Sequence, residues 1–503
     1  MLRSSRVLVA SGAAASLLLL VHGCSGGTQD NGFGTNPPGS ADGSAGGEGG
    51  PSSGDSGNYG DAFGGPTHDD AQPPPTSTCV NLQCQQHSCG DGGSTTISGA
   101  VYDPAGKNPL YDVVVYVPNS PVKALPSGAS CDSCDALFSG DPIAATITDA
   151  NGRFTLQHVP DGQNIPLVIQ VGKWRKQITI PKVLPCQDNA QPDKSLKLPK
   201  NHNEGDIPNI AISTGGADTL ECLLSRIGVE AGEYVGGGGG AGKIHIFQGG
   251  GGFFGGGPNT SPPGPASNAA LWSSKSALMA FDIVLLSCEG AETTAMNQQA
   301  LHDYASAGGR VFASHYHYAW FNSGPYASEN LATWSAGTND MGNINANIVT
   351  LLPNNQPFPK GQALKDWLGN VNALQGGKLP IQQARHNADV SAANTPSQQW
   401  ITADQSANPP NATEYFSFNT PTNAPIGDAG VPAYCGRVVF SDLHVGAASG
   451  DNPLAPVPSS CANADLSPQE KALEFMLFDL SSCVTVDNLP PQPPPTPPPP
   501  PPK

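Results

Sequence analysis

Charged residues are scarce in this sequence, and basic residues are the scarcest. Only 13% of the 503 residues are charged, with 23 Lys and Arg against 41 Asp and Glu, which gives a formal net charge of −18. Proteins that bind nucleic acids use clustered Lys and Arg side chains to neutralise phosphates. The composition therefore argues against a nucleic-acid partner, and we expect none.

Long apolar runs are absent after the first 21 residues. The one early run, VLVASGAAASLLLLV at 7–21, follows Arg3 and Arg6 and is too short to span a bilayer comfortably. This layout is typical of a secretory signal. The run ends in VHGC, which resembles the bacterial lipobox. The resemblance implies a signal peptide over 1–23, lipidation of Cys24, and an exported protein anchored in the outer membrane, periplasmic or at the cell surface. A plain cleaved signal peptide is the alternative.

Two terminal segments contain too few large apolar residues to form a core. Residues 24–78 are rich in Gly, Ser, Pro and Asp and contain no Lys or Arg. Such a segment cannot bury enough apolar surface to offset its ordering entropy, which predicts a disordered tether. Residues 486–503 are a proline-rich tail, for which polyproline II and a spacer role are expected.

Cysteines are numerous for a chain of this composition, and an exported location favours disulfides. If Cys24 is lipidated, six cysteines precede residue 200 and can close three bridges among themselves. Five follow residue 200 and leave one thiol over, for which we choose Cys288. A zinc site is the alternative for the first group. Its members would be Cys84, His87, Cys89, Cys131 and Cys134.

Residues 79–200 alternate apolar and polar side chains with period two, interrupted by Gly, Pro and Asn turns, which predicts a β-sandwich. One hairpin is predicted around residues 171–173. The stretches SGAVYDPAGKNPLYDVVVYV and TDANGRFTLQHVPDG resemble the carboxypeptidase regulatory-like (transthyretin-like) family. The resemblance covers about 90 residues. It implies a spacer, stability or adhesive module with no chemistry of its own.

The pattern changes over residues 205–485, where apolar strands alternate with amphipathic helices. Strands are predicted at 207–214, 242–248, 282–287, 309–314 and 436–445, and the clearest helices at 219–229, 291–308 and 467–482. This alternation predicts a doubly wound, parallel, flavodoxin-like α/β sheet. The expected fold class is thus multi-domain, with a β-sandwich followed by an α/β domain.

Three stretches of this second module resemble the class I glutamine-amidotransferase-like superfamily, particularly its ThuA-like branch. They are AFDIVLLSCEG, LHDYASAGGRVFASHYH and GRVVFSDLHVG, within a match of roughly 200 residues. The superfamily carries a nucleophilic cysteine at the tip of the strand at 309–314, where this chain has Ala313, Ser314 and His315. Only His444 matches a functional position. The resemblance therefore implies the fold but not amidotransferase activity.

Ligands of open α/β sheets bind at the carboxyl ends of the strands, and polar groups follow three of the predicted strands. Seven aromatic residues also fall between Phe312 and Trp334, and such rings favour a sugar, glycan or cell-wall ligand. Packing of these rings over the sheet is the alternative. The expected ligand-binding residues are Glu289, His315, Tyr316, His317, Tyr318, Trp320, Asp442 and His444.

Two chemical alternatives use the same strand ends. Because side chains alternate along a strand, His315 and His317 would share one face, as would Asp442 and His444, and the four could hold a divalent metal. Nucleophilic catalysis by Ser314 with His444, or by Cys288, is the other alternative.

The sequence thus favours a cell-envelope lipoprotein with a binding or structural role and no cofactor. A metal-dependent hydrolase acting on an envelope or carbohydrate substrate is the alternative function. The expected partners are the membrane, through Cys24, and a glycan or cell-wall component.

Overall fold

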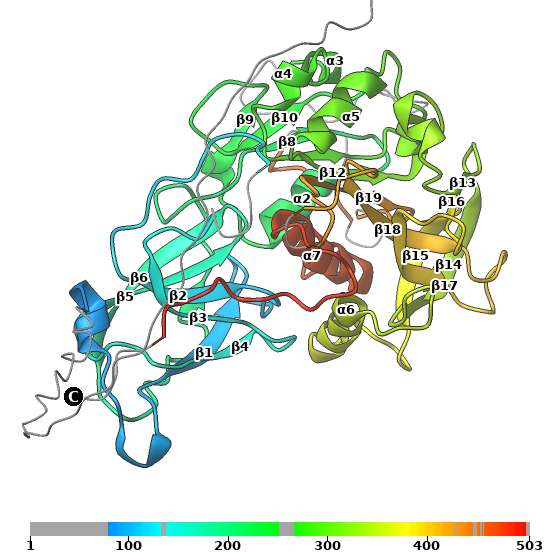
Figure 1. Cartoon of the computed structure of the whole chain (residues 1–503). Coiled ribbons are helices and arrows are strands. Elements are labelled where there is room, and N and C mark those ends of the chain that lie inside the picture. The colour runs from blue at the N-terminus through cyan, green and yellow to red at the C-terminus, as the bar shows by residue number, and fades with distance from the viewer. Residues whose placement is uncertain are drawn as a thin grey trace, which may run out of the picture. The chain divides into compact units, whose positions relative to one another are not determined.

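The computed structural model describes residues 79–131, 137–250, 266–427, 430–445, 450–452, 455 and 457–498. These residues belong to one compact unit. The signal peptide, the lipidated Cys24, the tether at 24–78 and Cys134 lie outside the described residues. In the described part the protein is multi-domain and mostly β, with large sheets and few helices (Figure 1).

The first module consists of two small sheets. One has the order β4-β1-β7 and the other β3-β2-β5-β6, and most of the pairing is antiparallel. The hairpin predicted around residues 171–173 is confirmed, since β5 ends at Val171 and β6 begins at Trp174. The strands are β1 (Ile97–Tyr102), β2 (Val114–Pro118), β3 (Pro142–Ile147), β4 (Arg153–Leu156), β5 (Gly162–Val171), β6 (Trp174–Val183) and β7 (Leu196–Lys197).

The second module is built on one ten-stranded sheet with the order β15-β14-β17-β18-β19-β12-β11-β8-β10-β9. The six strands from β19 to β9 are parallel. They are β8 (Ile210–Ser213), β9 (Tyr234–Gly236), β10 (Ile244–Phe247), β11 (Ile283–Leu286), β12 (Arg310–Ser314) and β19 (Gly436–Ser441). All four residues of each of the strands β8, β10 and β11 are buried, as expected for parallel strands covered on both faces.

The remaining four strands are antiparallel and were not predicted from the sequence. They are β14 (Asp340–Ile348), β15 (Leu379–Arg385), β17 (Ser397–Ala403) and β18 (Thr413–Thr420), and a short pair β13 (Thr333–Trp334) and β16 (Ala388–Asp389) lies apart from them. The sheet is therefore mixed, and the expectation of a purely parallel sheet is wrong for residues 340–420.

Helices follow most of the parallel strands. They are α2 (Leu220–Arg226), α3 (Asn268–Leu271), α4 (Lys275–Leu278), α5 (Gln298–Ser306), α6 (Pro359–Asn370) and α7 (Pro468–Ser481), with 3-10 turns η1 (Asn81–Gln85), η2 (Gly90–Gly92), η3 (Ala231–Glu233), η4 (His315–Trp320) and η5 (Pro325–Ser328). The helix predicted at 291–308 is confirmed only from residue 298. Among the described residues, no helix is long and apolar enough to cross a membrane.

Twelve of the fourteen residues of helix α7 are buried, and the helix connects the two modules (Figure 1). It begins with a capping box at Ser467, whose side chain accepts from the backbone of Glu470. Phe475 stacks on Tyr111 of the first module, and Phe478 packs edge-on against Trp174. The core of the first module and one face of the large sheet thereby form a single apolar cluster.

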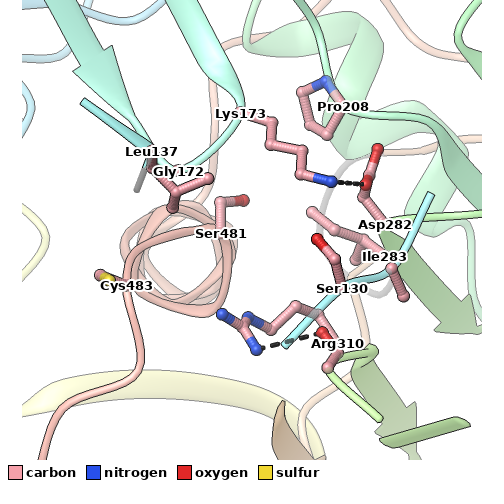
Figure 2. A pocket seen from close by; sticks show the side chains of 12 residues that line it. Ser130, Leu137, Gly172, Lys173, Pro208, Asp282, Ile283, Arg310, Ser481 and Cys483 are labelled. Atoms are coloured by element: carbon pink, nitrogen blue, oxygen red, sulfur yellow. Dashed lines mark hydrogen bonds and ion pairs between the residues drawn. The ribbon is translucent and has the colours of Figure 1, made fainter. Parts of the chain in front are cut away.

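The tip of the β5–β6 hairpin meets the last turn of α7 beside a cavity of about 40 Å³ (Figure 2). Gly172 has φ +55, and a Cβ there would lie 1.8 Å from the carbonyl oxygen of Ser481. The next residue, Lys173, places its Nζ 2.6 Å from a carboxylate oxygen of Asp282, just before β11. Glycine is therefore required for the hairpin to dock.

The disulfides cross the predicted boundary between the two cysteine groups. The described pairs are Cys79–Cys84, Cys89–Cys186, Cys131–Cys435 and Cys222–Cys461. The expectation that the six early cysteines pair among themselves is wrong, because Cys131 bonds Cys435 and joins the two modules. The zinc alternative is also wrong, because Cys84, Cys89 and Cys131 are all disulfide-bonded. The choice of Cys288 as the free thiol is confirmed.

The described part of the proline-rich tail packs against the first module. Pro491 and Pro494 are buried while Gln492 is exposed, a spacing of three that matches polyproline II. A cavity of about 290 Å³ lies between this tail and residues of β2 and β5, including Val114 and Gln170. Up to Pro494 the tail is therefore a packed segment, whereas residues 495–498 are exposed.

Two buried carboxylates have no hydrogen-bond partner in another residue. Glu221 of α2 and Glu414 of β18 are both 0% exposed. Burial raises the pKa of Glu221 to about 8 and that of Glu414 well above its usual range. Because the folded state holds these protons more tightly than the unfolded chain, folding stability falls as pH rises above about 4.5.

We predict that Gly172→Ala destabilises the protein by about 2–4 kcal/mol, because the Cβ meets both a backbone oxygen and a left-handed φ. The control is Gly238→Ala, where a Cβ meets no atom within 4 Å. Denaturant unfolding measures both variants. Equal stability of the two would contradict the docking role of Gly172.

We also predict that the free energy of unfolding falls between pH 5 and pH 8, and that Glu221→Gln reduces this fall by a few kcal/mol. The amide cannot ionise, so the free energy of unfolding of the variant rises relative to that of the wild type only at the higher pH. Exposed Glu230→Gln is the control. Denaturant unfolding at both pH values checks the slope, and an unchanged slope in Glu221→Gln would be the contrary result.

Candidate functional site

Three neighbouring parallel strands, β11, β12 and β19, end at the same edge of the large sheet. Their register places Leu286 beside Ala313, and Ala313 beside Phe440. The residues just beyond these ends therefore meet. Cys288, His315 and His444 are all buried, and one ligand atom from each lies within 4.8 Å of the others. We call these three residues the Cys-His-His cluster.

Cys288 is completely buried and is the free cysteine of the described residues. Its Sγ lies 3.2 Å from Nδ1 of His315. The backbone N–H groups of Gly290 and Tyr316 lie near enough to this sulfur to favour its thiolate form and lower its pKa. Burial outweighs them and raises the pKa of Cys288 to about 12. Without a further positive charge, the thiol stays protonated.

His315 occupies the turn at which β12 ends and η4 begins. Its φ is +45, a left-handed conformation that is uncommon for a residue other than glycine. Nε2 lies 3.1 Å from the carbonyl oxygen of Thr338, which can only accept, so Nε2 carries the proton. Nδ1 then presents its lone pair to Cys288. Burial, followed by His444 and Arg385, lowers the pKa of His315 to about 2.

His444 follows β19 and is 1% exposed. Neither of its ring nitrogens makes a hydrogen bond of good geometry, although the backbone of Gln383 lies near enough to raise its pKa slightly. Burial dominates and lowers the pKa of His444 to about 3. The ring centroid is 5.0 Å from that of His315. Its carbonyl accepts from Nε2 of Gln469 in the first turn of α7, which fixes the loop.

The other two residues of the predicted metal set lie elsewhere. His317 places Nδ1 3.0 Å from the Ser314 carbonyl oxygen and Nε2 3.3 Å from Oγ1 of Thr293. Asp442 accepts from the backbone N–H of Asn387 at 2.8 Å, and burial raises its pKa to about 8. Side chains alternate between the two faces of a sheet only within a strand. Because β12 ends at Ser314 and β19 at Ser441, the predicted alternation does not reach these residues. The pairings of His315 with His317 and of Asp442 with His444 are therefore wrong.

Ser314 does not pair with His444. Its Oγ donates to Oδ2 of Asp218 at 3.0 Å and accepts from the backbone N–H of Cys288 at 3.0 Å. It is fully buried. The predicted nucleophilic pair of Ser314 and His444 is therefore absent from this arrangement, and the hydroxyl instead ties the end of β12 to that of β11.

Most of the predicted ligand-binding aromatics are core residues. Tyr318 and Trp320 are 0% exposed, and Trp320 packs edge-on against Trp272 at 4.9 Å between centroids. Tyr316 is half-buried, with its hydroxyl 2.7 Å from Oγ1 of Thr338. The burial supports the alternative in which these rings pack over the sheet.

Glu289 lies at the same edge as the Cys-His-His cluster but has different partners. Its carboxylate accepts from Asn268 at 2.7 Å, and burial raises its pKa to about 7. Sequence reasoning missed the joining of Cys288 to the two histidines, and it also missed Arg385, whose charge lowers the pKa of both imidazoles. The adjacency of the predicted strands at 282–287 and 309–314 was the signal available for Cys288.

Comparison with known proteins gives no relative that carries an argument. No family model and no curated protein matches the chain. Two interface mutants of a type II cohesin–X–dockerin complex from Acetivibrio cellulolyticus match, each over 27% of this chain. The first has 15% identity, covers 86% of its own chain and has a TM-score of 0.16. The second has 13% identity, covers 85% of its own chain and has a TM-score of 0.15. A 9R-lipoxygenase from Cyanothece PCC8801 matches with 13% identity over 21% of this chain and 16% of its own, at a TM-score of 0.10. Scores this low say nothing about fold or function.

We predict that Cys288 stays unlabelled by a thiol reagent in the native, non-reduced protein and is labelled fully in denaturant, because the thiol is 0% exposed and protonated. Exposed Ser276→Cys supplies a rapidly reacting control within the same molecule. Peptide mass mapping reads both sites. Rapid native labelling of Cys288 would show an open, reactive thiol instead.

Proposed function

We propose that this chain is an exported lipoprotein, anchored through Cys24, whose α/β module binds a transition-metal ion at Cys288, His315 and His444. The observation that carries the proposal is His444. Its ring is buried, has no well-formed hydrogen bond, and lies beside a thiol and a second imidazole. A buried polar group without a partner costs about 1–3 kcal/mol, and a bound ion would remove that cost.

The donor set itself selects a class of metal. Thiolate and imidazole suit zinc, copper and other late transition metals, whereas magnesium and calcium take oxygen ligands. A cation at the cluster would also lower the pKa of Cys288 and remove its proton. The two backbone N–H groups at its sulfur would then support the thiolate.

The envelope location is supported by the four described disulfides, which are typical of oxidising compartments. For the fold, we propose a carboxypeptidase regulatory-like β-sandwich followed by a flavodoxin-like, amidotransferase-like domain. The two small antiparallel sheets and the six parallel strands support this relationship. An imidazole at the left-handed turn after β12, where the superfamily has its thiol, argues against amidotransferase activity.

A metal-dependent hydrolase is the second candidate. Three protein ligands leave a fourth position on a zinc ion, and catalytic zinc sites use that position for water. Against it, the three side chains are at most 2% exposed, which leaves a substrate no direct approach. A glycan-binding role has less support, because Tyr318 and Trp320 offer no open ring face.

We predict that the purified full-length chain retains or takes up one transition-metal ion per molecule. His444→Ala and Cys288→Ser should each weaken its affinity by more than ~100-fold, since loss of an outer-shell partner alone costs 10–100-fold. The control is His87→Ala, an exposed histidine paired with Asp161. Elemental analysis after dialysis against buffered zinc, cobalt, nickel and copper measures the stoichiometry.

The proposal fails if the wild type takes up no ion from any of these buffers, or if both variants bind as well as the control. Hydrolytic activity that is lost with a chelator and restored with zinc would favour the second candidate.

A further inference from the structure

The Cys-His-His cluster offers three ligands. Both ring nitrogens of His317 already have partners. Asp442 accepts a backbone hydrogen bond through Oδ2 only, but it is not part of the group of ligand atoms that lie together. Structural zinc sites are almost always four-coordinate. A set of two imidazoles and one thiolate without a carboxylate is instead the trigonal set of copper centres.

The spacing of the donor atoms suits one ion. Three donors around a metal at about 2.0–2.3 Å lie roughly 3.5–4 Å from one another. In the protein, Sγ of Cys288 and Nδ1 of His315 are 3.2 Å apart, and all three ligand atoms fall within 4.8 Å. A small outward movement of the thiol, with a shift of the His444 ring by less than about 1.5 Å, would therefore create the trigonal arrangement.

Outer contacts already orient each ligand. The Thr338 carbonyl holds the proton of His315 on Nε2, which leaves Nδ1 free to bind. The backbone N–H groups of Gly290 and Tyr316 lie near the sulfur of Cys288, and Gln469 holds the backbone of His444. Hydrogen bonding and hydrophobic burial around the cysteine sulfur are the features that tune copper–thiolate sites. The exposure of at most 2% supplies that burial.

On the basis of the proposed metal-binding function, we propose that the resident ion is copper, held by the Cys288 thiolate and the imidazoles of His315 and His444 in a trigonal site. Copper also stands above zinc in the order of divalent affinities for nitrogen and sulfur donors. The three side chains of the cluster give the proposed site its coordination number.

The test is titration of the full-length, metal-free chain with Cu(II), followed by visible absorption and electron paramagnetic resonance. Parallel titrations use Zn(II) and Co(II), and Cu(I) uptake is measured by competition with a chromogenic chelator. We expect one equivalent of copper, an intense visible thiolate-to-copper charge-transfer band, and loss of that band in Cys288→Ser. His444→Ala should weaken copper binding. His87→Ala should leave both the copper affinity and the absorption band unchanged. Circular dichroism confirms that each variant is folded.

The outcomes separate the two proposals. One outcome is that one equivalent of Zn(II) or Co(II) binds and is lost in His444→Ala, while copper gives no absorption band and no Cu(I) is taken up. This outcome overturns the copper assignment but leaves the proposed metal binding intact. Copper binding that persists unchanged in both Cys288→Ser and His444→Ala also overturns the assignment. Failure to bind any of the ions overturns both proposals.

Discussion

Helix α7 is packed on two sides, and most of the described structure depends on that packing. Its aromatic residues contact Tyr111 and Trp174 of the first module, while other residues lie against β12, β15 and β19 of the large sheet. Twelve of its fourteen residues are buried, so the helix is covered on nearly every side. The two modules therefore complete the burial of one helix and share one core. This explains why a disulfide and a glycine contact also cross between them.

The same helix positions the Cys-His-His cluster. Gln469 in its first turn holds the His444 carbonyl, and Glu470 pairs with Arg226 of α2, which also binds Asp451 at 2.7 Å. Near its other end, Asp479 takes Lys360 at 2.9 Å and Arg437 of β19 at 3.2 Å. Buried ion pairs add little net stability, but removing one partner is costly, so they fix the register of α7 on the sheet. His444 thereby reaches the ends of β11 and β12.

The sequence predicted five of the six parallel strands, because buried parallel strands read as continuous apolar runs, but it did not predict the short edge strand β9. It did not predict β14 to β18, whose strands carry many polar residues and whose order is set by pairing with distant partners. The carboxyl ends of the strands were predicted as the site. The directions predicted for the side chains of His317 and Asp442 were wrong. Those directions depend on whether β12 and β19 continue for two more residues, and strand ends are settled by tertiary contacts rather than by local pattern.

The burial of Cys288 protects its free thiol from exchange with the disulfides of the protein. In an oxidising compartment a free thiol near other cysteines is exposed to exchange, whose rate depends on thiolate character and access. Cys288 is 0% exposed and its pKa is raised, so both requirements are removed. A thiol protected in this way is a poor nucleophile, yet it remains a strong ligand for any cation that displaces its proton. The features that argue against catalysis by Cys288 are thus the ones that preserve it as a metal ligand beside His315 and His444.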